Sequence, residues 1–442
     1  MKSTSIIQIF IQNTWVNAAE IIDLGNGKCR FDYCSDYIYG NHLLPVSLAM
    51  PVGFYDVQYL PTEGGAPETL DHRIPPFLYD LVPQGAGRKF LSNLLHLADS
   101  DGVELTLLKA GAFNPIGALR INTAVEFYTQ LSSQVSGGQY DFSRGVELQE
   151  IQLKSEKFLY ELSVHGMLAS GTTGVQGAAP KYLLSKDKKG LWHPDMGLPD
   201  EEVLEHWLLK LPRGRSHDDL LVLRNEAAYL RVAKVCGIRV YAEPIFVNDM
   251  LFVRRFDRVV TDDAVNRLHQ ESLASLAGHR GFGIKTSHNE LLMAMRQYVN
   301  HPLQETVEYL KRDALNQALR NTDNHARNTA VQRNLDGTVS LTPLFDFAPM
   351  YKDPEMIPRA VHWKDQQGNV KTDWLDIFNT LELPQYELEY CAKEMLVFAD
   401  VISNLHEVCL NCGVDKSVVD ECSLSINKVA NSLYTLADFN RV

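Results

Sequence analysis

The spacing of apolar residues changes along this chain, and the change limits the folds that the chain can adopt. Up to about residue 260, apolar residues fall in short runs interrupted by Gly, Pro and Asn, a pattern typical of strands. Beyond residue 268 they recur with the helical period, in 290–299, 305–320, 386–406 and 416–436. We therefore expect an α+β protein with a mostly β part followed by a mostly α part.

The amino-terminal region, residues 1–130, is predicted to be an α+β subdomain. Strand-like runs occupy 6–12, 29–33 and 117–121, and a helix-like stretch occupies 90–98. The small polar stretch 134–139, with two adjacent glycines, is the best candidate for a linker.

Two further regions follow the linker. Residues 140–265 carry strand-like runs at 181–184, 207–211 and 251–256, with one helical pattern at 221–236 that Gly237 would end. In residues 266–442 helical patterns dominate and strand signals are few. A short strand is expected only at 340–344, before a D-F dipeptide.

Composition and charge exclude several classes of protein. With 442 residues, 45% of them hydrophobic, the chain can bury a core without disulfide or metal support. A net charge of −13 disfavours direct binding to duplex DNA. Seven Cys without a framework spacing indicate reduced thiols in a cytoplasm. No stretch approaches the ~20 apolar residues of a membrane span, so no membrane association is expected.

The strongest chemical signal is a set of three polar residues in the helical part. Phosphoryl transfer needs a carboxylate to accept a proton from the attacking hydroxyl, and oxygen ligands that hold Mg²⁺. Asp323 and Asn328 have the spacing of such a carboxylate and a metal-binding amide, and Asp346 lies in the D-F dipeptide. These residues could instead cap helices and turns.

Upstream residues fit a phosphate-binding site. Gly171, Gly174 and Gly177 form a glycine-rich string whose backbone N–H groups could approach phosphate oxygens, although a surface turn explains such a string equally well. Lys210 ends an apolar strand, and Glu226 on the following helix could hold it as an ion pair.

The segment 251–258 lies where the mostly β part passes into the mostly α part. A nucleotide kinase places its interlobe hinge at this point, so backbone groups there could read adenine. Alternatively, Arg255, Asp257 and Arg258 could form a structural ion-pair cluster at the end of a strand.

Together these motifs resemble the HipA family of serine/threonine kinase toxins. The resemblance is carried by the segments 175–181, 209–212, 225–226, 255–258, 268–271, 321–328 and 344–346. It implies a protein-kinase-like, two-lobed α+β fold with a β-rich N-lobe, an all-α C-lobe and an added N-terminal α+β subdomain. It also implies ATP and Mg²⁺ as cofactors and action in a bacterial cytoplasm.

The resemblance assigns a role to each matching residue. Asp323 would be the catalytic base, Asn328 and Asp346 the Mg²⁺ ligands, and Lys210, held by Glu226, the phosphate-binding lysine. The remaining nucleotide contacts would come from Gln176, Gly177, Ala178, Ala179, Pro180 and Lys181 along the nucleotide, Arg254, Arg255 and Phe256 at the hinge, and His325, Ala326, Arg327, Asn328 and Phe345 around the pocket.

Family resemblance also implies partners. Family members typically phosphorylate a translation component, often an aminoacyl-tRNA synthetase, and are held by a HipB-like DNA-binding antitoxin, so that DNA is bound only indirectly. Gly174 stands where the family carries a phosphorylatable serine, and Arg254 replaces an acidic hinge residue common in the family.

Two other functions remain alternatives. The chain could be a kinase-like protein that binds nucleotide or an antitoxin without transferring phosphate, which the Phe347-Ala348 variation on D-F-G would permit. Asp323, His325 and Asp346 could also hold the metal of a nuclease, although the glycine-rich string and Lys210 would then be unexplained.

Overall fold

The computed structural model describes residues 4–41, 44–55, 73–98, 102–135, 145–153, 180–214, 216–261 and 264–441. The chain divides into two compact units: Met1–Leu209 with Asp257–Glu271 and Gly278–Phe282, and Lys210–Phe256 with Ser272–Ala277 and Gly283–Val442. Among the described residues, no helix combines the length and the apolar character that crossing a membrane requires.

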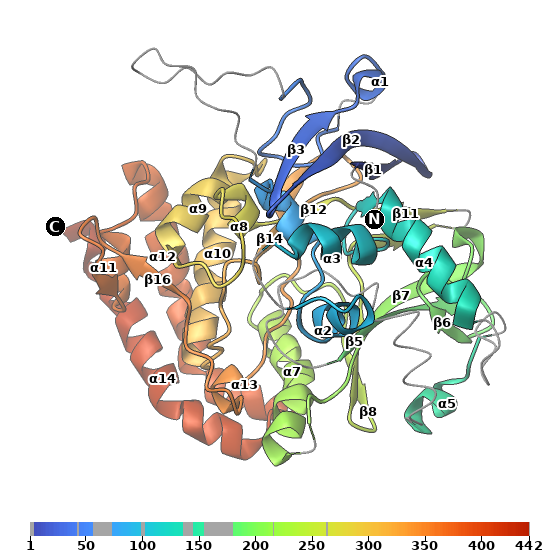
Figure 1. The fold of residues 1–442 in the computed structure, drawn as a ribbon. Coiled ribbons are helices and arrows are strands. Elements are labelled where there is room, and N and C mark those ends of the chain that lie inside the picture. Colours follow the sequence, from blue (N-terminus) through green and yellow to red (C-terminus); the bar gives the residue numbers. More distant parts are fainter. Residues whose placement is uncertain are drawn as a thin grey trace, which may run out of the picture. The chain divides into compact units, whose positions relative to one another are not determined.

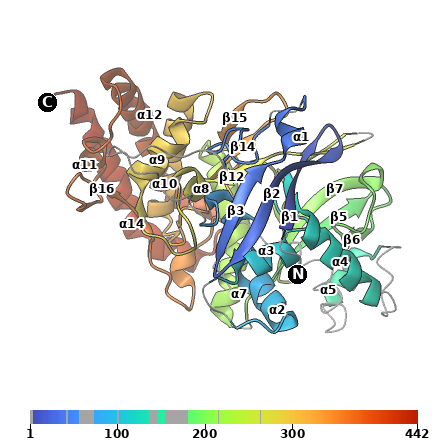
Figure 2. The same cartoon turned by 45° about the horizontal axis from the view of Figure 1, so that its top comes forward.

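The first unit is built on an antiparallel sheet with strand order β3-β2-β1-β4. These strands are β1 (Thr4–Ile11), β2 (Thr14–Gly25), β3 (Lys28–Tyr33) and β4 (Leu119–Ile121). Gln12 and Asn13 join β1 to β2 with positive φ angles, as a two-residue hairpin turn that matches the strand twist requires. Figure 2 shows α4 (Asn122–Val135) beside β1, which it contacts.

The other elements of the first unit are short. They are α1 (Ser35–Ile38), η1 (Pro76–Asp80), α2 (Gly85–Leu94), α3 (Glu104–Gly111), α5 (Leu148–Leu153), β5 (Lys181–Asp187), β6 (Trp192–Pro194), η3 (Asp200–Glu202), β7 (Val203–Lys210), β10 (Arg258–Val260), β11 (Val265–Arg267) and β12 (Gln270–Ser272). Leu183 of β5 belongs to the same buried apolar cluster as Ile7 and Ile9 of β1, so the first sheet and β5 share one core.

The second unit is mainly helical. It contains α7 (His217–Val235), β8 (Ile245–Val247), β9 (Met250–Arg254), α8 (Leu273–Leu276), β13 (Thr286–Ser287), α9 (His288–Arg296), α10 (Pro302–Ala318), β14 (Ala330–Arg333), β15 (Val339–Leu341), η4 (Met350–Lys352), β16 (Val361–Lys364), β17 (Val370–Lys371), α11 (Trp374–Phe378), α12 (Gln385–Ser403), α13 (Leu405–Asn411), α14 (Lys416–Tyr434) and η5 (Thr435–Arg441). The long helices α10, α12 and α14 pack side by side (Figure 1).

Local signals explain where the helix after β7 begins and ends. Ser216 caps α7 by accepting a hydrogen bond from the Asp219 amide, and two aspartates occupy the first turn, where the helix dipole favours negative charge. Gly237 follows the helix with a φ of +80°, the left-handed conformation that glycine adopts without a Cβ clash.

Several helices begin or end at residues other than those predicted from the sequence. The helix expected at 90–98 begins at Gly85 and ends at Leu94. The helix expected at 386–406 is two helices, because α12 ends at Ser403 and α13 begins at Leu405. The mostly α region also holds the short strands β13 to β17, and most of the expected linker 134–139 lies outside the described residues.

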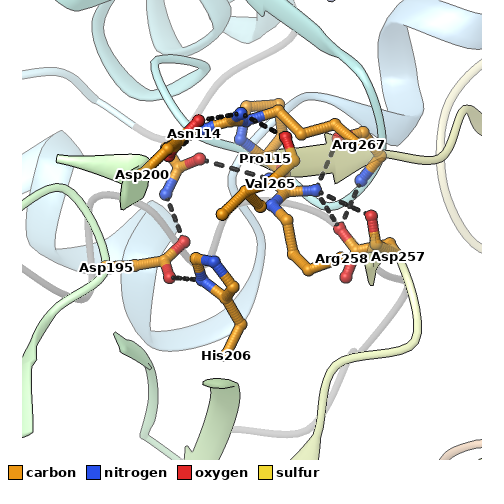
Figure 3. A network of polar contacts seen from close by, with 10 residues as sticks. Asn114, Pro115, Asp195, Asp200, His206, Asp257, Arg258, Val265 and Arg267 are labelled. Atoms are coloured by element: carbon orange, nitrogen blue, oxygen red, sulfur yellow. Dashed lines mark hydrogen bonds and ion pairs between the residues drawn. The ribbon is translucent and has the colours of Figure 1, made fainter. Parts of the chain in front are cut away.

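A buried polar network stabilises the first unit, and Figure 3 shows it with Arg258 at its centre. The Arg258 guanidinium donates to the carbonyl of Gly117 at 2.8 Å and to Asp257 Oδ2 at 2.5 Å, and it also contacts Asn114 and Pro115. Asp257 Oδ2 accepts from the Gly117 amide at 2.8 Å. Gly117 has a φ of +99°, which favours glycine at this turn.

The network continues to Asp195, directly after β6, and to His206 of β7 in the same unit. Asn114 donates its side-chain amide to Asp195 Oδ2 at 2.6 Å, and His206 Nδ1 lies 2.5 Å from Asp195 Oδ1. Asp257 and Arg258 are therefore parts of a structural cluster, as one of the two readings of the sequence anticipated. The cluster joins the turn at 114–117 to the segment that follows the predicted hinge.

We expect Arg258→Met to lower the free energy of unfolding by about 3–5 kcal/mol, because it leaves the carboxylate of Asp257 buried without its cation. Urea denaturation measures this loss. Arg30→Met is the matched control, because Arg30 lies 3.9 Å from Glu20 in an exposed pair that contributes at most about 1 kcal/mol. An equal effect of the two substitutions would contradict a structural role for the buried network.

Candidate functional site

The centre of the candidate site is the ammonium group of Lys210, at the end of β7. It donates to Glu226 Oε1 of α7 at 2.5 Å and to Asp346 Oδ1 of the D-F dipeptide. Lys210 and Glu226 are buried, and Asp346 is half-buried. Burial alone would lower the pKa of Lys210, but the two carboxylates outweigh it, so the pKa lies above its ordinary value.

Contacts with the carboxy-terminal helices hold α7 in place. Asn225, next to Glu226, donates to the Asp415 carboxylate at 2.7 Å and accepts from the Asp415 amide at 2.8 Å. Arg224 adds an ion pair to the same carboxylate at 2.5 Å. Since Asp415 caps α14, the position of Glu226 is tied to the helical core of the second unit.

The loop that carries the predicted base follows α10. Asn328 donates its side-chain amide to the carbonyl of Asp323 at 2.8 Å, which closes the loop. The Asn328 Oδ1 atom is buried and accepts no hydrogen bond from any residue that the structure describes. A buried amide oxygen without a donor carries a desolvation penalty that a bound cation would remove.

The loop places its polar residues around one small cavity. Asp323 is 6% exposed and its Oδ1 atom lies 3.6 Å from Nε2 of His325. Asp323, Asn328 and Asp346 line the same cavity of about 30 Å³, together with His325, Ala326 and Phe345. This volume is sufficient for about one water molecule.

The two residues before Phe347 continue the site toward the predicted hinge. Asp346 has a φ of +49°, a left-handed conformation that costs energy for a non-glycine residue and occurs at active sites as well as in turns. The ring of Phe345 lies 6.0 Å from that of Phe256. Phe347 is buried and packs 5.1 Å from Tyr229 of α7, so the D-F dipeptide is held on the same helix as Glu226.

The other predicted residues lie as follows. Arg254 ends β9 and is half-buried, and Arg255 is buried. Arg327 is buried, and its guanidinium contacts Ser272 Oγ at 3.3 Å. Pro180 and Lys181, at the start of β5, belong to the first unit.

The glycine-rich string lies outside the described residues, so the predictions that concern it are not tested by the structure. Gly171, Gly174, Gln176, Gly177, Ala178 and Ala179 are all in this part of the chain. Their roles along the nucleotide therefore stay predictions.

Several polar residues that the sequence did not single out line the same cavity, and three of them, His288, Asp313 and Asn324, lie against one another. A signal existed for two of them. Asn324 lies inside the recognised motif, next to Asp323, and Asp313 is a carboxylate within the apolar stripe of a helix, where a buried charge is unusual. Nothing in the spacing of His288 would have found it.

The donor atoms fit a magnesium ion. Mg²⁺ prefers oxygen ligands, usually one or two carboxylates supplemented by phosphates and water. Asn328 supplies an amide oxygen without a hydrogen-bond donor among the described residues, and Asp346 supplies a carboxylate at the same cavity. Within the described ranges, no cluster of three or more His, Cys, Asp or Glu side chains has the arrangement of a metal site.

Comparison with known proteins identifies the chain's relatives. The HipA N-terminal domain model matches residues 8–122, and the HipA-like C-terminal domain model matches residues 173–401, more than half of the chain. No curated protein sequence matches the chain.

Two solved structures are similar to the chain. One is a chain from the HipA, HipB and operator DNA complex of the Shewanella oneidensis MR-1 toxin–antitoxin system, with 16% identity, 99% coverage of both chains and a TM-score of 0.62. Another is the Helicobacter pylori proinflammatory kinase CtkA, with 13% identity, a TM-score of 0.38, and coverage of 53% of this chain and 90% of that chain. The predicted α+β, protein-kinase-like fold is confirmed, and the match of the C-terminal model shows that the chain belongs to the HipA family.

Proposed function

We propose that this protein is an ATP- and Mg²⁺-dependent serine/threonine protein kinase that transfers the γ-phosphate of ATP to a hydroxyl group of another protein. The single observation that carries the proposal is the contact of Lys210 with both Glu226 and Asp346. A phosphate-binding lysine, its helix glutamate and a metal-binding aspartate are the parts that a kinase must hold together. The nuclease alternative assigns no role to Lys210 or to its pairing with Glu226.

The proposed mechanism assigns one task to each side chain. Lys210 binds phosphate oxygens of ATP, and Glu226 orients its ammonium group. Asn328 and Asp346 would hold Mg²⁺, which neutralises charge on the phosphates when it is bound. Asp323 accepts the proton of the attacking hydroxyl as its oxygen bonds to the γ-phosphorus, and the bond from that phosphorus to the β–γ bridging oxygen breaks, releasing ADP.

The proposed partners follow from family membership. The Shewanella HipA chain is in a complex with HipB and operator DNA. We infer that a HipB-like antitoxin holds this chain too, and that DNA is reached only through it, in keeping with a net charge of −13. The substrate class that we favour is a component of translation in a bacterial cytoplasm, such as an aminoacyl-tRNA synthetase.

Transfer of label from γ-labelled ATP into a bacterial lysate tests the proposal. We expect a labelled protein band with Mg²⁺ and none when EDTA removes the metal, because the transferred charge then has no counter-ion. Calorimetry with ATP and Mg²⁺ provides the control for binding. ATP binding without any transfer would favour the alternative of a kinase-like binding protein.

A further inference from the structure

The side chain of Asn324 binds the backbone of a distant segment. Its Nδ2 group donates to the carbonyl of Val361 at 2.9 Å. Its Oδ1 atom accepts from the amides of Ala360 at 3.0 Å and Val361 at 3.4 Å. The amide side chain therefore pairs with the peptide groups around Val361 on both its donor and its acceptor side, as a neighbouring strand would.

The segment that Asn324 binds is itself fixed. Val361 begins β16 and is fully buried, and it pairs with Thr286 of β13 in a parallel ladder. The strand is thus a rigid support for the residue next to the predicted base.

The buried carboxylate of Asp313 also binds β16 and the residue segment before it. Asp313 of α10 accepts hydrogen bonds from Arg359 at 2.6 Å and from the indole of Trp363 at 2.8 Å, the two residues that flank Val361 at a distance of two. Gln317 donates to the same carboxylate at 2.7 Å. Burial would raise the pKa of Asp313, but His288 and Arg359 outweigh it and hold the pKa well below its usual range.

His288 connects this carboxylate to Asn324. Its Nε2 atom lies 3.3 Å from Asp313 Oδ1 and 3.3 Å from Asn324 Nδ2, while Nδ1 lies 2.8 Å from the Tyr309 hydroxyl. The imidazole also stacks on Trp363, with ring centroids 4.9 Å apart. Because one ring nitrogen cannot donate to Asp313 and accept from Asn324 at the same time, the orientation of Asn324 is set by the β16 backbone, with the imidazole packed beside its amide nitrogen.

We propose that Asn324 is a positioning residue, which fixes the carboxylate of Asp323 for proton transfer by anchoring the adjacent backbone to β16. The proposal rests on the proposed kinase function. Asp323 itself reaches the cavity from a loop rather than from a helix or strand, and Asn324 adds an anchor on one side of it to the hydrogen bond that Asn328 donates to its carbonyl. Loss of the anchor should impair the chemical step while the groups proposed to bind ATP stay in place.

Steady-state transfer from γ-labelled ATP·Mg²⁺ into the labelled lysate protein tests this inference, with calorimetric ATP affinity and thermal midpoint measured alongside. We expect Asn324→Ala to lower kcat by about 10²-fold, the usual effect of misplacing a catalytic group by about 1 Å. The KM and the dissociation constant for ATP should stay within about twofold of the wild type. Asn324→Asp keeps the accepting oxygen and loses the donor. Its kcat should lie between those of the wild type and Asn324→Ala.

Asn289→Ala is the matched control. Asn289 also binds β16 and, through Thr380, makes a similar number of hydrogen bonds, but it is not adjacent to Asp323. We expect this variant to keep the wild-type kcat even where its thermal midpoint falls as far as that of Asn324→Ala. Equal losses of kcat in both variants, or a loss of ATP affinity in Asn324→Ala, would overturn the positioning role of Asn324. The proposed kinase function would still stand. Absence of transfer by the wild type would overturn the proposed function and this inference together.

Discussion

Replacing Asp323 by Asn is expected to reduce phosphate transfer by roughly 10²–10⁴-fold, the range that general-base catalysis contributes. An amide has the shape of the carboxylate but does not accept the proton of the attacking hydroxyl at neutral pH. The folded structure should persist, because asparagine keeps the size of the side chain and the backbone carbonyl of Asp323, to which Asn328 donates, is unchanged. The rate of label transfer from γ-labelled ATP·Mg²⁺ into a bacterial lysate measures the effect.

A matched substitution separates loss of the base from a general effect of charge removal. Asp336 lies in an exposed turn of the same unit, where its carboxylate accepts from the Thr338 amide and hydroxyl. Asp336→Asn should leave transfer unchanged. Comparable transfer by wild type and Asp323→Asn, with ATP binding demonstrated for both, would refute the assignment of Asp323 as the base.

Replacing Lys210 by Met is expected to lower the free energy of unfolding by about 3–5 kcal/mol at pH 7 and to abolish measurable ATP binding. Methionine fills a similar volume but removes the ammonium group that lies between the carboxylates of Glu226 and Asp346, in a largely buried position. The phosphates of ATP would also meet two negative charges with no lysine to offset them. Urea denaturation and calorimetry measure the two effects.

The pH dependence of this stability difference has a definite sign. The pKa of Lys210 lies above its ordinary value of 10.5, so the folded protein holds the proton more tightly than the unfolded chain. The stabilisation is then fully present below about pH 10 and is lost only as the pH rises through the folded-state pKa. A difference between wild type and variant that vanished on acidification to pH 6 would contradict the ion-pair explanation.

Lys109→Met controls for the removal of a buried lysine. Lys109 pairs with Asp23 at 2.5 Å in the first unit, and its side chain is as buried as that of Lys210. We expect this variant to lose stability and to keep its affinity for ATP. A loss of ATP affinity in both variants would indicate that destabilisation, and not the missing phosphate ligand, explains the result for Lys210.

Local features of the sequence were sufficient to predict most elements. The period of apolar residues and Gly237 predicted the end of α7 closely, because a helix depends on contacts between residues three or four positions apart, whereas its start at His217 lies four residues before the predicted one. The break between α12 and α13 at Asn404 was missed, since no Gly or Pro marks it. The strands β13 to β17 were mostly missed because two to four residues are too few to show a period.

The candidate site was predictable to the extent that its residues stand in recognisable motifs. Asp323, Asn328 and Asp346 were found by their spacing and order, and the structure places them around one cavity. Asn324 and Asp313 were not found, because their importance lies in contacts with β16 and Arg359, which are 36 to 46 positions away in the chain. No local pattern records such a contact.

The sequence by itself determined the chemical types of the site residues, their order and the secondary structure on which most of them lie, since these depend on neighbouring residues. Only the tertiary structure decided that Lys210 meets Asp346, 136 positions later, and that Arg258 is buried against Asn114, 144 positions earlier. The physical reason is that a buried charge is stable only when packing of distant segments supplies its partner. That partner is selected by the fold of the whole unit and not by the residues on either side.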